Sequence, residues 1–490
     1  MTLSIGEARS WIAGLERQTP LLGGGARRYV NLDNAATTPP FRQALEAVHG
    51  FADWYASVHR GSGFKSSLST ELYGRCRRTV AEFVGADPDY HAAIFCSNTT
   101  DAINKLCGIY RLAPGERFLT TVMEHHSNML PWRLAGPVDY VSIRRTDGAL
   151  DIECLERKLR EHQGRIRLVS VTGASNVTGT IPPLQEIARL AHRHGAQLLV
   201  DAAQLVAHRP IRMGSGADPE RIDFLAFSAH KMYAPFGSGA LIGPKEFFES
   251  QTPSVVGGGA VDVVTLNRVE WSLIPDRMEA GTPNLIGALA LARAIQALDE
   301  LGMENVARHE RELTAKALRR LARVAGVKVY GDQDPELKRD RVGVIPLMSE
   351  KIHHALLAAV LGYEWGIGVR HGCFCAHPYV IDLLALKDEE VFRYIEEVRN
   401  GDRSKRPGFV RVSLGLYNTE EEIEYLAGAL EHILAHGPRG RYAVDPSTGD
   451  RIPEGFSFDL DSHFPLFAPR RPAPPRLERN AERVGLAPRV

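Results

Sequence analysis

Short apolar segments alternate with longer segments of helical period across the first half of this 490-residue chain. One helical segment, 182–195, begins with proline and ends with glycine, as helices commonly do. Such alternation is typical of a mostly parallel sheet whose two faces are covered by helices. We therefore predict an α/β fold with strands at 92–97, 117–122, 138–143, 166–173, 196–203, 223–229 and 238–243.

The second half of the chain has a different pattern, and the total length exceeds that of one ordinary core. From about residue 286 helical segments dominate, and they are followed by short strand-like segments, which together predict a smaller α+β domain. Beyond about residue 436 proline and arginine are frequent, and we expect an extended or packed arm without recognisable chemistry. The expected organisation is an N-terminal arm at 1–30, a large domain at 31–285, a small C-terminal domain at 286–436 and a Pro/Arg-rich tail at 437–490.

Composition excludes several classes of function. Lysine plus arginine equals aspartate plus glutamate at 59 each, so the chain has no electrostatic footprint for nucleic acid. It has no signal peptide and no apolar segment long enough to cross a membrane, so we expect a cytoplasmic protein without a membrane partner. Six cysteines are too few for a disulfide framework in a chain of this length.

Polar residues collect where predicted strands end. Thr99 and Thr100 open a helix, where backbone N–H groups can hold a phosphate, although simple capping also explains them. His125 follows the next strand, and Asn176 follows another; packing and turn formation are the alternatives for these two.

Asp201 and Lys231 are more informative because each follows an apolar strand. A carboxylate at such a position is costly unless it has a hydrogen-bonding or cationic partner. A lysine among apolar neighbours is a candidate for a lowered pKa and covalent chemistry, and the alternative is a solvated loop lysine.

The segment RHGCFCAHPY, 370–379, allows several interpretations. In a strand, His371, Cys373, Cys375 and His377 would face one side, which suits a metal poorly because zinc ligands usually come from two separate places. A disulfide between the two cysteines would be strained, and buried inert thiols are a further alternative. A reactive thiolate is the fourth interpretation.

Together these motifs resemble the fold-type I enzymes that bind pyridoxal phosphate (PLP), and more narrowly the class V aminotransferase family with its cysteine desulfurases and selenocysteine lyases. The resemblance runs from NLDNAATTPP (31–40) through MEAGTPN (278–284) to LGLYNTEEEIEYLAGAL (414–430). It implies a PLP-dependent transferase fold of type I, with a mostly parallel sheet in the large domain.

The resemblance also implies roles for individual residues. Lys231 would bind PLP covalently and Asp201 would pair with its ring nitrogen. Arg411 would bind the substrate carboxylate near Arg370 and Asn176, and Cys375, in the Arg-x-Gly-x-x-Cys-Ala-x-Pro motif, would accept sulfur. The other implied cofactor contacts are a stacking His125, Gln204 near Asn176 at the phenolic oxygen, Thr99, Thr100, Ser228 and His230 at the phosphate, and Thr282 supplied across a homodimer interface.

These roles predict cleavage of the C–S or C–Se bond of a cysteine-like amino acid, with a persulfide on Cys375 and release of alanine. Arg370, His371 and His377 are expected to lower the pKa of Cys375, and Cys373 is a candidate second carrier or resolving thiol. The alternatives are another class V activity that does not need Cys375, and a metal- or sulfur-carrier protein without turnover.

The chain departs from the family pattern in the segment between Cys375 and Arg411, which affects the prediction of the sulfur acceptor. Cys375 and Arg411 are further apart than in single-domain desulfurases, and the extra residues lie at 380–408. This insertion would cover the active site, bind a partner such as a sulfur-acceptor protein, or change substrate access.

Overall fold

The structure is a computed structural model that describes residues 5–59 and 61–464. The chain divides into one compact unit, 1–453, and a second that starts at residue 454, whose described part contains the short helix α15 (Leu460–His463). Among the described helices, none is long and apolar enough to cross a membrane.

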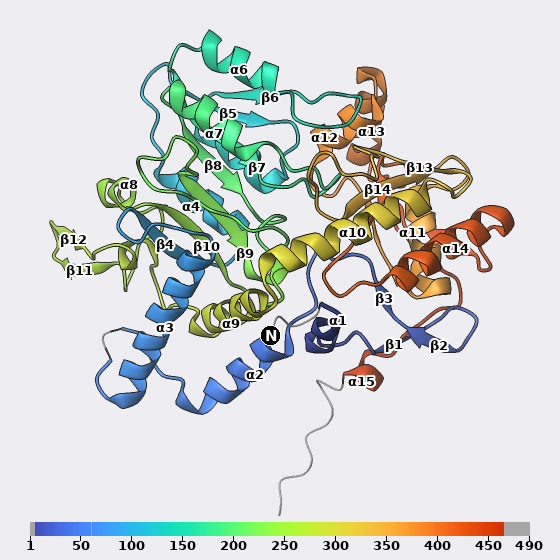
Figure 1. The fold of residues 1–490 in the computed structure, drawn as a ribbon, viewed down its shortest axis with the longest axis horizontal. Helices are drawn as coiled ribbons and strands as arrows, with labels where there is room; N and C mark the ends of the chain where they lie inside the picture. Colours follow the sequence, from blue (N-terminus) through green and yellow to red (C-terminus); the bar gives the residue numbers. More distant parts are fainter. Residues whose placement is uncertain (1–4, 60, 465–490) are drawn as a thin grey trace, which may run out of the picture. The chain divides into compact units, whose positions relative to one another are not determined.

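A seven-stranded sheet forms the centre of the large domain (Figure 1). Its strand order is β4-β10-β9-β8-β7-β5-β6. Strands β5 to β9 pair in parallel, and β10 is antiparallel to both of its neighbours. The bounds confirm the predicted strands: β4 (His91–Cys96), β5 (Arg117–Thr121), β6 (Val138–Val141), β7 (Ile166–Thr172), β8 (Gln197–Asp201), β9 (Phe224–Ser228) and β10 (Gly239–Pro244).

Alternate residues of each strand enter two separate cores, so both faces of the sheet are covered. In β8, Leu198 and Val200 join the larger core and Leu199 joins the smaller one. This alternation follows from the two-residue period of a strand. The helices of the large domain are α2 (Arg42–Phe51), α3 (Phe64–Phe83), α4 (Thr99–Ile109), α5 (Leu130–Ala135), α6 (Ile152–Glu161), α7 (Leu184–Arg193), α8 (Lys245–Ser250) and α9 (Leu285–Leu301). The α/β fold prediction is confirmed.

A second, antiparallel sheet, with strand order β13-β14-β17-β16, lies in the same compact unit, in the region predicted as the small domain; the predicted domain boundaries stay a prediction. It shares a core with three helices. The strands are β13 (Val327–Val329), β14 (Val344–Ser349), β16 (Arg370–Gly372) and β17 (Phe409–Ser413), and the helices are α10 (Met303–Leu321), α11 (His354–Trp365) and α14 (Glu420–His436). The segment β3 (Val30–Asn31) pairs with β15 (Ile367–Gly368), so the chain enters the large domain from beside this sheet.

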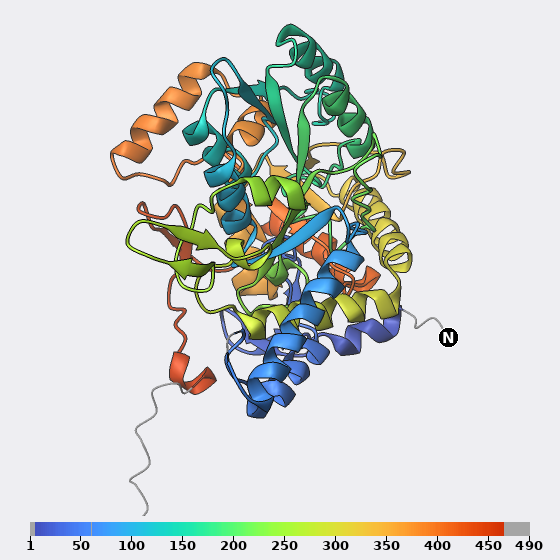
Figure 2. The ribbon, with the colours of Figure 1, turned by 90° about the vertical axis from the view of Figure 1, so that its left-hand side faces the viewer.

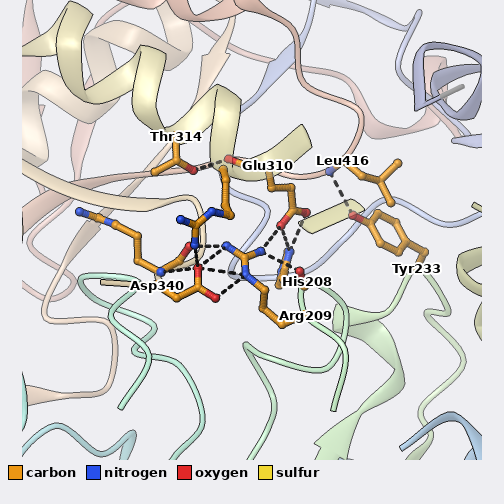
Figure 3. Close-up of polar contacts among 9 residues, drawn as sticks. His208, Arg209, Tyr233, Glu310, Thr314, Asp340 and Leu416 are labelled. Carbon is orange, nitrogen blue, oxygen red and sulfur yellow. Dashed lines mark hydrogen bonds and ion pairs between the residues drawn. The ribbon is translucent and has the colours of Figure 1, made fainter. Parts of the chain in front are cut away.

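A polar network around the buried residues His208, Arg209 and Glu310 connects the segment after β8 to α10 (Figure 3). His208 Nδ1 lies 2.8 Å from Glu310 of α10, and Arg209 Nε lies 3.0 Å from Asp340. Arg311 makes a third contact, to Asp340 at 2.6 Å. Because buried charges are destabilising unless paired, this network favours one fixed arrangement of these segments.

The remaining elements lie along the edges of these domains. The insertion begins within α12 (His377–Leu384) and contains α13 (Asp388–Arg399), which lies at the periphery of the fold and is orange in Figure 2. The predicted tail begins with a hairpin of β18 (Tyr442–Val444) and β19 (Arg451–Pro453), and its residues 465–490 lie outside the described residues. The other short elements are α1 (Ile5–Ala8), β1 (Gln18–Pro20), β2 (Ala26–Arg28), β11 (Val261–Val264) and β12 (Val269–Trp271).

Candidate active site

Asp201 and Lys231 lie at the same edge of the large sheet. Asp201 is the last residue of β8, and Lys231 follows the end of the neighbouring parallel strand β9 by one helical turn. Because the carboxyl ends of neighbouring parallel strands meet at one edge of a sheet, these distant residues become neighbours. Asp201 is 5% exposed, and its carboxylate accepts a hydrogen bond from the backbone of Ala203 at 3.0 Å.

The environment of Lys231 favours its neutral amine over the protonated form. Burial, with smaller contributions from Arg411 and Arg370, lowers the pKa of Lys231 to about 8, although Asp201 and Cys375 oppose this shift. Burial raises the pKa of Asp201, while Ala203 and Lys231 oppose that rise. A lysine amine with this pKa is partly neutral near pH 7 and can act as a nucleophile or base.

The start of α4 is built to receive an anion. Thr99 Oγ1 and Ser228 Oγ lie 2.6 Å apart, and the backbone N–H of Thr99 donates to the same Ser228 oxygen at 2.7 Å. Thr100 is exposed and lies 2.7 Å from Ser127 Oγ. The N-terminus of a helix attracts phosphate through its free backbone N–H groups, and the hydroxyl groups here can donate further hydrogen bonds.

Two histidines border this region and are neutral near pH 7. Burial and Lys231 lower the pKa of His230 to about 4, and the same two causes, with smaller contributions from His126 and Arg411, lower that of His125 to about 4. His125 Nδ1 lies 3.0 Å from Ser127 Oγ, which fixes the ring. A neutral, fixed imidazole is suited to stacking on an aromatic ring.

Arg411 is the buried cation of the site. It is 2% exposed, and its Nη2 donates to Asp33 Oδ1 at 2.9 Å. Its Nη1 donates to the backbone oxygen of Asn176 at 3.0 Å. Arg370 lies opposite Arg411 across the β16–β17 pair and contacts Asp33 at 3.3 Å. One aspartate therefore holds both guanidinium groups.

Asn176 and Gln204 are buried and use their amide groups to fix loops. The side chain of Asn176 donates to the backbone oxygen of Phe374 at 2.7 Å, and Gln204 donates to that of Ala35 at 2.6 Å. Asn176 thus connects the strand β7 side of the site to the cysteine loop.

The cysteine loop leaves the strand earlier than the sequence suggests. Strand β16 ends at Gly372, and Phe374 and Cys375 have left-handed φ values of 52° and 55°. His371, Cys373, Cys375 and His377 therefore do not share one face of a strand, because the backbone turns between them. The backbone N–H of His126 donates to the Cys375 oxygen at 2.7 Å and holds the turn.

The two cysteines of this loop are in different environments. Both are free thiols; Cys375 is exposed and Cys373 is buried. Cys373 donates to the backbone oxygen of Pro407 at 3.0 Å, and burial raises its pKa to about 12. Since the thiolate is the nucleophile, Cys375 is the better placed of the two for attack.

The neighbouring histidines do not add positive charge to Cys375. Burial lowers the pKa of His377 to about 4 and also lowers that of His371, although Asp450 opposes the latter shift. His377 instead stacks on His126 with ring centroids 4.9 Å apart. Two of the three residues expected to act on Cys375, His371 and His377, are therefore mostly neutral near pH 7.

Thr282 lies in a different part of the surface. It is exposed and lines a cavity of about 570 Å³ together with His59, Gly258 and Asp262. Its predicted role depends on a second copy of the chain and stays a prediction.

Two carboxylates of the site were not predicted. Asp33 organises Arg411 and Arg370, and the DNAATT segment that contains it gave no indication of that role. Glu124 is fully buried and accepts hydrogen bonds from Thr121 Oγ1, Asn128 Nδ2 and the backbone of Thr172. Burial raises the pKa of Glu124 to about 8. In the sequence, Glu124 is marked only by its position at a strand end, directly before two histidines.

The described residues fit a PLP-type cofactor. Lys231 offers an amine of lowered pKa for an aldehyde, Asp201 offers a buried carboxylate for a ring nitrogen, and the start of α4 offers hydroxyl groups for a phosphate. Over the described ranges, no three His, Cys, Asp or Glu residues are grouped as metal ligands.

Comparisons with known proteins agree with this geometry. A family model described as Aminotransferase class-V matches residues 30–426. The chain is 35% identical over 415 residues to a probable cysteine desulfurase of Halalkalibacterium halodurans, covering 82% of this chain and 92% of that protein. It is 33% identical over 444 residues to a cysteine desulfurase of Escherichia coli, covering 88% of this chain and 99% of that protein.

Solved structures of two desulfurases have similar folds. The apo structure of the cysteine desulfurase from Thermococcus onnurineus NA1 gives a TM-score of 0.72 at 29% identity, over 83% of this chain and 95% of that one. The Escherichia coli cysteine desulfurase CsdA, in its S-sulfonic acid form, gives 0.73 at 26% identity, over 89% and 99%.

Proposed function

Because the chain belongs to the class V aminotransferase family, we propose that it is a PLP-dependent cysteine desulfurase. The observation that carries the proposal is the position of Cys375. Its side chain is exposed at a left-handed turn, and Cys375 lies near enough to Lys231 to contribute to the pKa of that lysine. A nucleophilic thiol and a basic lysine thus share one site, as transfer of sulfur from an amino acid requires.

The proposed binding mode uses the groups around Lys231. Lys231 would hold PLP covalently, Asp201 would pair with its ring nitrogen and His125 would stack on the ring. Gln204, near Asn176, contacts its phenolic oxygen. Thr99, Thr100, Ser228 and His230 surround its phosphate. The neutral state of His125 and the buried carboxylate of Asp201 support these assignments.

The substrate-binding residues, Lys231 and Cys375 each have a role in the proposed reaction. When bound, PLP supplies the electron sink for the pairs released at the α-carbon and on C–S cleavage. Arg411, near Arg370 and Asn176, holds the substrate carboxylate, and Lys231 removes the α-proton. The Cys375 thiolate attacks the substrate sulfur; the S–S bond forms as the C–S bond breaks, which leaves a persulfide on Cys375 and, after protonation, alanine.

We also propose a homodimer. Thr282 is exposed in its own chain and lines a cavity with Gly258 and Gly281. In the proposed dimer, Thr282 reaches the PLP phosphate of the other copy. Sedimentation of the intact protein with and without PLP tests this directly, and a monomer with full activity would contradict it.

The experiment for the proposed function is the measurement of alanine and sulfide released from L-cysteine by the PLP-loaded protein. A parallel reaction with L-selenocysteine separates C–S from C–Se cleavage. Equal amounts of alanine and sulfide in the presence of a reducing thiol support a desulfurase. Pyruvate and ammonia instead of alanine would indicate a β-eliminating class V enzyme, for which Cys375→Ser would retain activity. A protein that binds sulfur without product formation would be a carrier.

A further inference from the structure

A cationic cavity lies on the outer side of the cysteine loop. It has a volume of about 460 Å³, within the range of roughly 300–1,000 Å³ that is usual for small-molecule sites. Both cysteines of the loop line it, together with Arg370, Arg403 and Arg406. Lys231 and Asp201 do not line it, but Asp33, Arg370 and Cys375 do, so the cavity adjoins the proposed PLP site.

The insertion and the first part of the tail form the walls of this cavity. Arg403 and Arg406 follow helix α13, and the backbone at Pro407 accepts the hydrogen bond of Cys373. A Cβ at Gly408 would approach the Gly372 backbone to 2.6 Å, so glycine allows the insertion to cross directly over the loop. The insertion therefore packs directly against the cysteine loop.

The hairpin β18–β19 closes another side. Its turn contributes Thr448, Gly449 and Asp450 to the lining, and Asp450 pairs with His371 at 3.2 Å. Arg403 Nη1 donates to the backbone oxygen of Ser447 at 3.0 Å, which joins insertion and hairpin. The tail was expected to have no chemistry, and this part of it lies against the reactive loop.

The charges of the cavity are unbalanced. Three arginines, Arg370, Arg403 and Arg406, and two carboxylates, Asp33 and Asp450, line it. Arg370 pairs with Asp33 and Asp450 contacts His371, whereas Arg403 and Arg406 form no ion pair within the part of the chain that the structure describes. The buried Nε of Arg406 and the Nδ1 of His354, a residue 6% exposed, also have no hydrogen-bond partner. Unpaired cations and unused polar atoms in a cavity of this size are the features of a site for an anion.

We propose that this cavity binds a small thiol that carries an anionic group, and that this thiol is the acceptor of the sulfur held on Cys375. Arg403 and Arg406 bind the anionic group, which aims the thiol at Cys375. The acceptor thiolate attacks the outer sulfur of the persulfide; the S–S bond breaks, its electron pair returns to Cys375 as a thiolate, and the acceptor leaves as a persulfide. No external oxidant or reductant is needed. The proposal rests on the desulfurase function proposed above.

The test compares two thiols of similar size, anionic 2-mercaptoethanesulfonate and neutral 2-mercaptoethanol, as acceptors for the full-length PLP-loaded protein. The measured quantity is the ratio of their kcat/KM values for alanine release from L-cysteine. In the wild type we expect the anionic thiol to be preferred. In the double variant Arg403→Gln, Arg406→Gln this ratio should fall by about tenfold or more, which is the effect of losing a hydrogen bond to a charged group. Arg399→Gln, an exposed arginine of α13 that does not line the cavity, is the matched control and should keep the wild-type ratio.

A second measurement does not depend on the variants. Ethanesulfonate, which lacks the thiol, should compete with 2-mercaptoethanesulfonate in the wild type. A ratio that does not differ between wild type and double variant, with no competition, would overturn the cavity proposal and leave the desulfurase function intact. Persulfide formation that no small thiol can discharge would overturn it in favour of a protein acceptor. Absence of alanine with every thiol, and in a single turnover, would contradict the desulfurase function itself.

Discussion

The guanidinium of Arg411 donates to Asp33 across 2.9 Å, although the two residues are 378 positions apart. The residue proposed to bind the substrate carboxylate therefore already holds a carboxylate of the protein. An incoming amino acid must share Arg411 with Asp33 or displace it, and Arg370 provides a second cation for Asp33 at 3.3 Å.

This competition predicts the effect of Asp33→Asn. Removing the charge should weaken the hold on Arg411 and lower the KM for L-cysteine by about fivefold, which corresponds to roughly 1 kcal/mol, the net value of a typical hydrogen bond. The measurement is steady-state alanine release over a range of L-cysteine concentrations. A higher KM would mean that Asp33 positions Arg411 and does not compete for it.

Lys231→Ala should abolish the visible absorbance of covalently bound PLP and all alanine formation. No other described lysine is shown within interaction distance of Asp201, so none can replace it. Absorption spectra and turnover assays check this, with the exposed Lys338→Ala as control. Retained absorbance and activity in Lys231→Ala would refute the assignment.

Asp201→Asn should reduce turnover by about a hundredfold, the scale of losing one preorganised electrostatic contact. A neutral amide cannot keep the ring nitrogen protonated, so electron withdrawal is weaker. Asp223→Asn is a matched control, since Asp223 is also buried but lies before β9, at the opposite end from Lys231. It should lower stability without lowering the activity of the folded protein, whereas equal losses in both variants would argue against a special role of Asp201.

The lowered pKa of Lys231 predicts the pH dependence of PLP uptake by the apo-protein. Only the neutral amine attacks an aldehyde, and a pKa lowered to about 8 brings half of the amine into that form at pH 8 instead of 10.5. The rate of covalent PLP binding should therefore rise up to about pH 8 and then level off. Nα-acetyl-lysine, treated in parallel, corrects for the titration of PLP. A rate that follows this free lysine up to pH 10 would show that burial does not lower the pKa of Lys231.

The sequence was sufficient for the parts of the site that follow from regular structure. Strand ends at Asp201 and Lys231 could be located from apolar periodicity, and parallel pairing then brings them together. The Asp33–Arg411 pair could not be located, because it depends on how a segment near the N-terminus packs beside the small domain. The turn at Phe374 and Cys375 was also missed, because residues other than glycine rarely adopt left-handed φ values. The cavity beside the cysteine loop could not be predicted, because its walls form where the insertion packs near the hairpin β18–β19, and neither segment has a recognisable motif.

The central claim is that Cys375 accepts the sulfur of the substrate. Cys375→Ser should still bind PLP and L-cysteine but should form no protein persulfide. Cys373→Ser should form the persulfide in the first turnover, because the buried Cys373 thiol has a raised pKa and donates to Pro407.

Mass spectrometry of the peptide that spans residues 370–379, after one turnover without an acceptor thiol, tests this claim most directly. We predict one added sulfur on Cys375, with one alanine released per site. Added sulfur on Cys373, or alanine formation with neither cysteine modified, would contradict the account.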